Sequence, residues 1–272
     1  MLWDRYASLR LGKPGTTGKE FTGLRLVFSV EMSDTNTPNA AKIDLYNAAP
    51  DSIALAQDPE CEVRLIVGYK DAAQQIFVGN PIAQGVKLVR GKVDTTLHIE
   101  AQDGGRAYGE ARCTISYATP TTLEQVFNEI VRQTGQVLGT VRLPVFTFPV
   151  GYVYSGQATD AFNQLASLSG SSVFVVDGAL QFVEAGGATS EQAIVFSADS
   201  GNLIGSPSPK DDGCIEVKGL LGNAQALRPG RVFSVQSRDY NGFFTANSVR
   251  FSGDVGSSSN EWYVNVVGTA RS

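Results

Sequence analysis

Apolar and polar residues alternate along most of the first hundred positions of the chain. From Leu24 to Val30 every second residue is apolar, which is the period of a strand with one buried face. The same signal returns in short segments at Ala41–Leu45, Val63–Val67, Gln75–Val78, Lys87–Val89 and Leu97–Ala101. One short helical turn over Ser52–Ala56, with Asp51 as its cap, is expected among them. Closely spaced strands without a helix of normal length between them favour an antiparallel barrel or sandwich.

Helical periodicity replaces this alternation in the middle of the chain. Thr121 and Glu124 have the spacing of a capping box, and the apolar residues that follow fall on one helical face. A second amphipathic segment covers Ala158–Ser169. The Asp177-Gly178 pair between two apolar runs then predicts a hairpin. The middle of the chain is therefore predicted to be a small α+β module with two helices.

Strand-like alternation returns after a glycine-rich segment at Gly186–Ser190 and continues towards the end of the chain. We therefore predict a mainly β protein with a small α+β insert. In this prediction two β-barrel-like domains flank the two-helix module. The predicted boundaries are residues 1–116 for the N-terminal β-barrel-like domain, 117–186 for the α+β module and 187–272 for the C-terminal β-barrel-like domain.

The composition agrees with many short strands and narrows the classes of partner. Charged residues make up only 18% of the 272 residues, and 29 glycines can occupy tight turns. The net charge of −5 argues against a general nucleic-acid binder, which needs clustered Lys and Arg. We expect no membrane insertion, because no apolar run approaches the roughly 20 residues of a spanning helix and the N-terminus lacks the apolar core of a signal peptide. The widely separated Cys61, Cys113 and Cys214 are expected to be buried or half-buried thiols of a protein that folds in a reducing cytosol.

Residues that could carry catalysis are sparse. His98 is the one histidine of the sequence, which excludes multi-histidine metal sites. Because His98 alternates with Leu97 and Ile99, it shares a polar strand face with Thr96 and Glu100, and we interpret this face as solvated or as part of an interface. The sequence has no nucleophile elbow, P-loop or dinucleotide-binding motif, and its carboxylates are interpreted as solvated charges. We therefore expect no catalytic, cofactor-binding or metal-binding residues.

The two tryptophans, Trp3 and Trp262, lie near the two ends of the sequence. One interpretation places them in the core or in sheet packing. The other makes either of them an anchor for a neighbouring subunit, because tryptophan is enriched at the energetic centres of protein interfaces.

Short sequence motifs follow one another in a characteristic order along nearly the whole chain. The N-terminal part carries Leu2-Trp3-x-Arg5, the strand Leu24–Glu31, Ile43-x-Leu45-Tyr46-Asn47, Gly68-Tyr69, Ile76–Gly79 and Asp103-Gly104. The C-terminal third carries Leu203–Pro207, Ile215–Val217, Leu227–Gly230, Gly253-Asp254 and Glu261-Trp262. In this order the chain resembles the baseplate hub proteins of contractile-tailed bacteriophages, which are related to the late control protein D family. It is similar, more distantly, to the N-terminal part of type VI secretion spike proteins.

This resemblance implies a structural virion protein in the tail baseplate, made and assembled in the host cytoplasm. The two β-barrel-like domains would be tube domains, and the subunit would form a homotrimer whose six tube domains surround a channel. The partners implied are a tail tube or tube-initiator protein, a spike protein and baseplate wedge proteins. DNA would pass through the channel without specific binding. Thr96, His98 and Glu100 would then face the lumen or a neighbouring subunit.

Two further functions remain open at the level of the sequence. The chain could be another structural component of a tail, such as a tube-initiator, distal tail or secretion-spike subunit. It could also be a cell-wall hydrolase carried on the baseplate, which would need two carboxylates that converge in one cleft.

Overall fold

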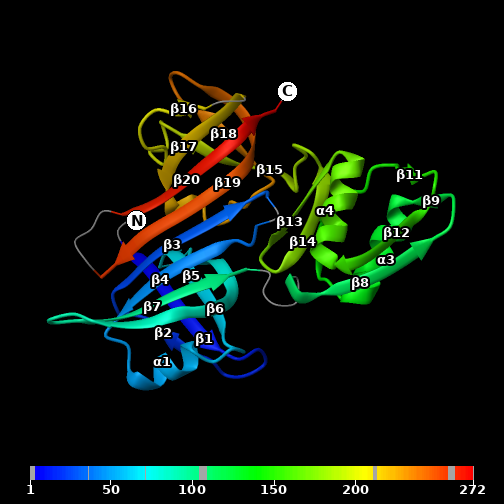
Figure 1. Cartoon of the computed structure of the whole chain (residues 1–272). Coiled ribbons are helices and arrows are strands. Elements are labelled where there is room, and N and C mark those ends of the chain that lie inside the picture. The colour runs from blue at the N-terminus through cyan, green and yellow to red at the C-terminus, as the bar shows by residue number, and fades with distance from the viewer. Residues whose placement is uncertain are drawn as a thin grey trace.

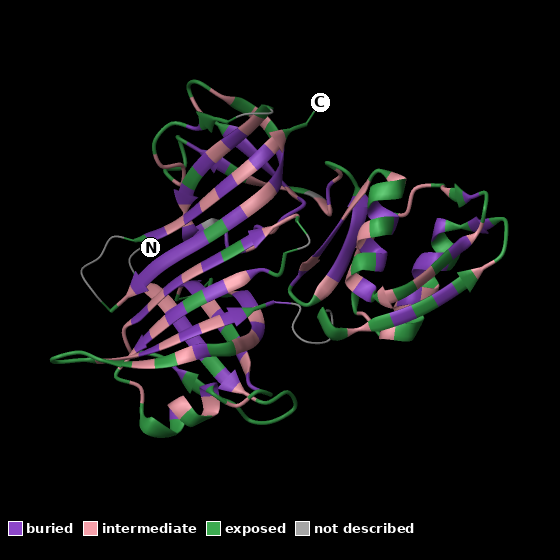
Figure 2. Ribbon diagram, in the orientation of Figure 1, coloured by how far each residue is buried: buried purple, intermediate pink, exposed green. Residues whose placement is uncertain are grey.

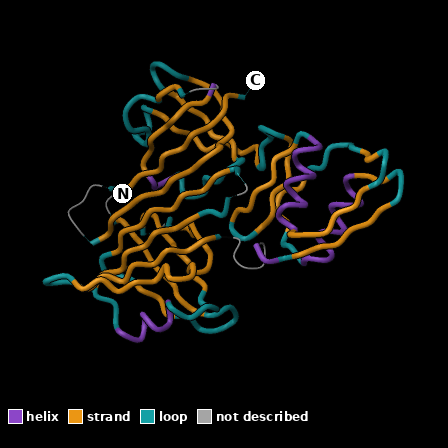
Figure 3. Tube along the Cα trace, viewed as in Figure 1, coloured by secondary structure: helices purple, strands orange, loops and turns teal. Residues whose placement is uncertain are grey.

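The computed structural model describes residues 4–35, 37–70, 72–103, 109–210, 213–256 and 261–271, and most of them lie in strands (Figure 1, Figure 3). The mainly β fold is therefore confirmed. The N-terminal part forms β1 (Arg5–Gly12), β2 (Lys19–Phe21), β3 (Leu26–Ser33), β4 (Ala40–Tyr46), α1 (Pro50–Ala56), β5 (Glu62–Tyr69), β6 (Gln74–Arg90) and β7 (Thr95–Gln102). The middle forms β8 (Arg112–Tyr117), β9 (Thr121–Thr122), α3 (Leu123–Thr134), β10 (Leu138–Val141), β11 (Thr147–Phe148), β12 (Tyr152–Gln157), α4 (Ala158–Ser169), β13 (Ser171–Val176) and β14 (Ala179–Glu184). The last part forms β15 (Ser190–Ser197), β16 (Ser208–Pro209), β17 (Cys214–Leu220), the 3-10 helix η2 (Leu221–Asn223), β18 (Arg231–Gln236), β19 (Asn241–Val255) and β20 (Trp262–Ala270).

The N-terminal and C-terminal strands belong to one continuous sheet rather than to two separate ones. Its order is β16-β17-β20-β19-β3-β4-β7-β6-β5-β1-β2, and β18 and β15 extend it from β19. The junction is the antiparallel pairing of β3 with β19, which runs from Ser248 opposite Ser33 to Val255 opposite Leu26. Figure 1 shows the blue and orange strands side by side at this junction. The predicted division into two tube domains stays a prediction.

Alternating apolar residues build one core under this sheet, as Figure 2 shows by the alternating buried and exposed bands along the strands. At the junction, Gly253 of β19 lies opposite Phe28 of β3 on one side and Trp262 of β20 on the other. The Phe28 and Trp262 rings meet edge to face, with centroids 5.5 Å apart. Such aromatic pairs add about 0.5–1.5 kcal/mol beyond the burial of their surface. The absence of a side chain at Gly253 therefore allows an aromatic contact that joins the two ends of the chain.

The α+β module has its own core around the two helices. Phe127 of α3, Phe162 of α4 and Phe182 of β14 pack edge to face, with neighbouring centroids 5.3–5.5 Å apart. The β13–β14 hairpin is buried on both faces, because a second cluster of Phe174, Val176 and Val183 lies on its other side. A Cβ at Gly230 would come within 3.1 Å of Phe174, so this second face packs closely against the C-terminal strands. The hairpin thus connects the module to the continuous sheet.

The structure corrects several details of the predicted elements. The capping box of α3 is formed by Thr122 and Gln125, not by Thr121 and Glu124, because Thr121 still pairs with Phe148 in a short sheet. Helix α1 begins at Pro50 with Ala49 as its N-cap, so Asp51 lies inside the first turn and makes no cap bond. The segments Gln75–Val78 and Lys87–Val89 belong to the single long strand β6. Strands β1, β8 and β12 and the short strands β2, β9, β10, β11 and β16 were not predicted.

Candidate functional site

The sheet presents a continuous polar face that crosses the junction between its two halves. It consists of outward side chains that alternate with the core residues and follow the strand register. We call this surface the shared polar face and define it by Glu216 and Lys218 of β17, Asn265 of β20, Arg250 of β19, Glu31 of β3, Lys42 and Asp44 of β4, and Thr96, His98 and Glu100 of β7. Four carboxylates thus share the surface with three permanent cations and one histidine.

Thr96, His98 and Glu100 lie together on this face, and Leu97 and Ile99 are buried between them, as the alternation predicted. Arg250 lies opposite Glu31 across the junction, and their side chains form an ion pair at 3.4 Å. Opposite charges in facing positions stabilise a strand pair and keep the surface close to neutral. Whether the face meets a lumen or a neighbouring subunit stays a prediction.

Both ring nitrogens of His98 have a carboxylate partner on the shared polar face. Its Nδ1 lies 2.6 Å from Asp44 Oδ1 and its Nε2 lies 3.2 Å from Glu100 Oε1. Partial burial by itself lowers the pKa of His98, but the hydrogen bonds and charges of the two carboxylates outweigh it, so the pKa lies above its usual value. His98 in turn lowers the pKa of Glu100. The side chain is 26% exposed, so its proton can exchange with solvent.

Trp262 is only 1% exposed and packs in the core against Phe28. It therefore offers no surface to a neighbouring chain, and core packing is the interpretation that its position supports. Trp3 lies outside the described residues. The cysteines have the predicted positions, with Cys61 and Cys113 buried and Cys214 half-buried.

A polar junction that the sequence did not predict fixes the module to both halves of the sheet. Asp103, after β7, accepts a hydrogen bond from the backbone N–H of Gly178 at 2.8 Å and one from Asn39 Nδ2 at 3.2 Å. Asn39 Nδ2 also donates to the carbonyl of Val175 at 2.8 Å. These bonds hold the tip of the β13–β14 hairpin against the N-terminal strands.

Arg228 contributes the other half of this junction. Its guanidinium donates to Asp177 in the hairpin turn at 2.9 Å, to the carbonyl of Gln75 in β6 at 2.8 Å, and to the carbonyls of Gln225 and Leu227 in its own loop. The side chain is 11% exposed. One cation therefore links the N-terminal strands, the module and the C-terminal strands. The sequence placed Arg228 in the motif Leu227–Gly230 but gave no sign of its contacts, since its partners lie on three separate segments.

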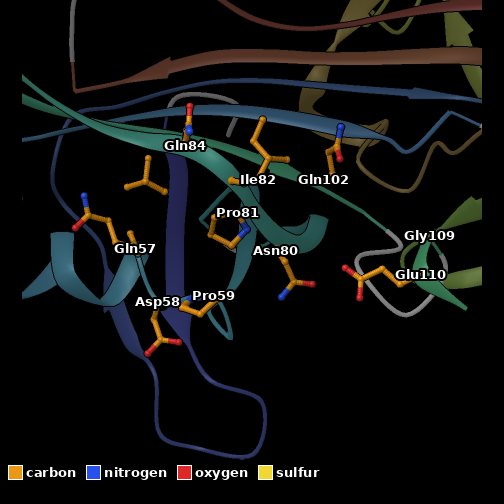
Figure 4. A pocket seen from close by; sticks show the side chains of 13 residues that line it. Gln57, Asp58, Pro59, Asn80, Pro81, Ile82, Gln84, Gln102, Gly109 and Glu110 are labelled. Atoms are coloured by element: carbon orange, nitrogen blue, oxygen red, sulfur yellow. The ribbon is translucent and has the colours of Figure 1, made fainter.

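Several hollows border the N-terminal half, and two of them have the largest volumes. The first, of about 620 Å³, lies between the end of α1, the middle of β6 and the start of β8. Figure 4 shows Gln57 and Asp58 on one side of it, Ile82 of β6 across it and Glu110 at its far end. The Glu60 backbone N–H and the Lys13 ammonium hold the pKa of Asp58 below its usual range. Asp58 is therefore an ionised, paired carboxylate, unsuited to donate a proton in acid catalysis.

The second hollow, of about 860 Å³, lies between the N-terminal strands and the module and includes Arg64, Val137 and Asp177 in its lining. Within the described residues, no group of three or more His, Cys, Asp or Glu side chains is close enough to hold a metal ion. Among the same residues, no helix has the length and apolar character needed to cross a bilayer.

No protein-family model matches the sequence, and no curated protein matches it. Solved structures, in contrast, match almost the whole chain. A tail protein of Neisseria meningitidis MC58 is 12% identical, with a TM-score of 0.67 over 98% of this chain and 96% of its own. The 43 kDa tail protein of prophage MuSo2 from Shewanella oneidensis is 11% identical, with a TM-score of 0.64 over 97% of this chain and 98% of its own.

A third match is an E. coli component of the type VI secretion system, described as structurally similar to T4 bacteriophage tail proteins. It is 14% identical, with a TM-score of 0.63 over 96% of this chain and 77% of its own. At such identities the likeness concerns the fold alone. The chain therefore shares its fold with these two tail proteins and with this component of the type VI secretion system.

Proposed function

We propose that this chain is a structural subunit of a contractile phage-type tail and forms the trimeric central hub of the baseplate. The observation that carries the proposal is the likeness to a Neisseria tail protein and a prophage tail protein, which extends over 96–98% of both chains in each pair. A likeness of this extent includes the module as well as the continuous sheet. The further likeness to a secretion-system component supports a common tail-like architecture.

The continuous sheet suits such a role physically. In the proposed hub each subunit contributes two related halves to a ring, so three subunits supply six positions around the channel. Contacts between subunits in such a ring are heterologous and close on themselves. The β3–β19 ladder fixes the two halves of one subunit to each other without a flexible linker. A threefold spike and a sixfold tube can then bind opposite ends of one rigid body.

The shared polar face is the surface that we propose for the channel wall. Its four carboxylates, three cations and His98 leave it close to neutral, and the whole chain carries a net charge of −5. A wall of this kind does not bind phosphates tightly, because its positive and negative charges nearly cancel. On this proposal the protein performs no reaction, needs no cofactor, and resides in the baseplate of the virion after assembly in the host cytoplasm.

Co-assembly tests the proposal. The purified chain is mixed with a tail-tube or tube-initiator protein and a spike protein from the same genome, and complexes are imaged by electron microscopy. We expect one three-copy ring between spike and tube. A chain that binds neither protein, or that binds with other than three copies, contradicts the hub. A polar channel wall made by surfaces other than the shared polar face contradicts that part of the proposal.

A further inference from the structure

The β6–β7 hairpin extends beyond the sheet to which it belongs. Strand β6 pairs with β5 only up to Gly79 and then pairs with β7 as far as Arg90. Figure 1 shows the cyan hairpin reaching past the neighbouring strands. We call residues 86–94 the arm.

A bulge directs the arm away from β5. Between Pro81 and Val86, five steps along β6 face only two steps along β7, from Ala101 to Ile99. Gln84 in this bulge has a φ of 63°, a conformation that a residue with a side chain seldom adopts. Bulges bend a strand and increase its twist, so the second half of β6 leaves β5 at this point.

The arm therefore has an open strand edge. Among the described residues, no strand pairs with β6 on the side opposite β7 beyond Gly79. Open edges present unpaired backbone groups that can pair with another chain. Apolar side chains are exposed on the same hairpin, with Val89 56% exposed and Val93 93% exposed at the tip.

The charges of the arm are opposite to those of the remaining chain. The arm carries Lys87, Arg90 and Lys92 against the single carboxylate of Asp94, a net charge of +2. Since the whole chain carries −5, the remainder carries −7. Within the part of the chain that the structure describes, none of these three cations forms a salt bridge. Asp94 is occupied, because it accepts a hydrogen bond from Asn47 at 3.0 Å.

We propose that the arm binds the acidic body of a second copy of this chain, through its open strand edge and its three cations. Of these cations, Lys87 also interacts electrostatically with Glu100 of its own chain. The inference deepens the proposed function and rests on it for the closed ring, because the arm would be one of the contacts between neighbouring hub subunits. Complementary charge selects the partner and its orientation, while the exposed valines and the strand edge supply contact area.

The test compares two triple variants with the same change in net charge. One is Lys87→Glu, Arg90→Glu and Lys92→Glu in the arm. The control is Lys70→Glu, Arg112→Glu and Arg238→Glu, which reverses three exposed cations elsewhere. Sedimentation velocity measures self-association of the full chain at several salt concentrations. We expect the self-association constant of the arm variant to be about tenfold or more below that of the wild type, and that of the control to stay within about threefold. Added salt should lower the self-association constant of the wild type, because it screens the charges.

A photo-crosslinking phenylalanine analogue in place of Val93 identifies the occupant directly, with the same analogue at the exposed Val153 as control. Crosslinks from position 93 to a second copy support the proposal. The arm contact is overturned if the arm variant forms a threefold ring as well as the wild type does. It is also overturned if position 93 crosslinks only to another tail protein. Both results leave the proposed hub function standing. If copies associate through the arm but form no closed threefold ring, the proposed hub function is overturned and the arm contact stands. If the chain never self-associates, both proposals are overturned.

Discussion

Gly253 allows a direct test of how the two ends of the chain are joined. A Cβ at this position would lie 2.6 Å from Phe28 Cζ and 2.6 Å from Trp262 Cε3. Carbon atoms in contact prefer separations of about 3.5–4.0 Å, so Gly253→Ala would force both rings to move by about 1 Å. Both rings are almost fully buried and cannot move into solvent.

The magnitude follows from two opposing effects. Overpacking of a filled core costs about 1–3 kcal/mol. Alanine in place of glycine in a strand recovers about 0.5–1 kcal/mol, because the unfolded chain loses conformational freedom. Because both contacts would be as short as 2.6 Å and both rings are buried, the upper part of the overpacking range, about 2–3 kcal/mol, applies here. We therefore expect Gly253→Ala to lower the free energy of unfolding by about 1–2.5 kcal/mol, with a change in tryptophan fluorescence because Trp262 is one of the contacted rings.

Denaturant unfolding followed by tryptophan fluorescence and circular dichroism measures this loss. Gly109→Ala is the matched control, because a Cβ there meets no atom within 4 Å. Gly253→Ala with stability within about 0.5 kcal/mol of the wild type would refute the proposed packing at the junction. A large loss in Gly109→Ala would show that the assay responds to something other than overpacking.

Three further predictions concern the module and the shared polar face. Arg228→Ala should lower the free energy of unfolding by about 2–4 kcal/mol and accelerate hydrogen exchange at Gly178, because it leaves Asp177 and the Gln75 carbonyl without their charged donor. The control Arg132→Ala, which breaks an exposed ion pair inside the module, should cost less than about 1 kcal/mol. Equal effects of the two substitutions would contradict the role of Arg228 in linking the module to the sheet. Thr122→Ala should cost about 1 kcal/mol in thermal or denaturant unfolding, whereas Thr122→Ser, which keeps the hydroxyl cap, should stay near the wild type. The pKa of His98 is raised in the folded protein. Its contribution to the free energy of unfolding is therefore complete below the pKa of the unfolded state, 6.5, and is lost as the pH rises through the pKa of the folded state. The stability advantage of the wild type over His98→Asn should therefore shrink as the pH rises above about 6.5, and a difference independent of pH would argue against the pairing with Asp44 and Glu100.

Local patterns predicted much of the fold because the responsible forces act locally. The bounds of the second helix, Ala158–Ser169, agree with the structure, since its apolar spacing and the glycine after it determine both ends. The alternation along β3, β4 and β7 correctly separated buried from polar positions. Strand β1 escaped prediction because Ala7, Ser8 and Leu9 are buried in succession, so the strand shows no simple alternation.

Long-range contacts could not be predicted in the same way. The pairing of Phe28 with Gly253 joins residues from opposite ends of the chain, and neither residue marks the other in the sequence. The partners of Arg228 lie on three segments whose proximity depends on the complete fold. The face that carries Thr96, His98 and Glu100 could be predicted from alternation, but its continuation through Glu31 and Arg250 requires the β3–β19 ladder.

The mass and rotational symmetry of the purified protein are the most direct test of the proposal that three copies of this chain form a hub ring. Light scattering combined with electron microscopy of the same particles gives both quantities. We predict a threefold ring with a central channel and a mass of about 87 kDa, which corresponds to three chains of 29.0 kDa. A compact monomer that forms no ring, alone or with tail-tube and spike proteins, would contradict it.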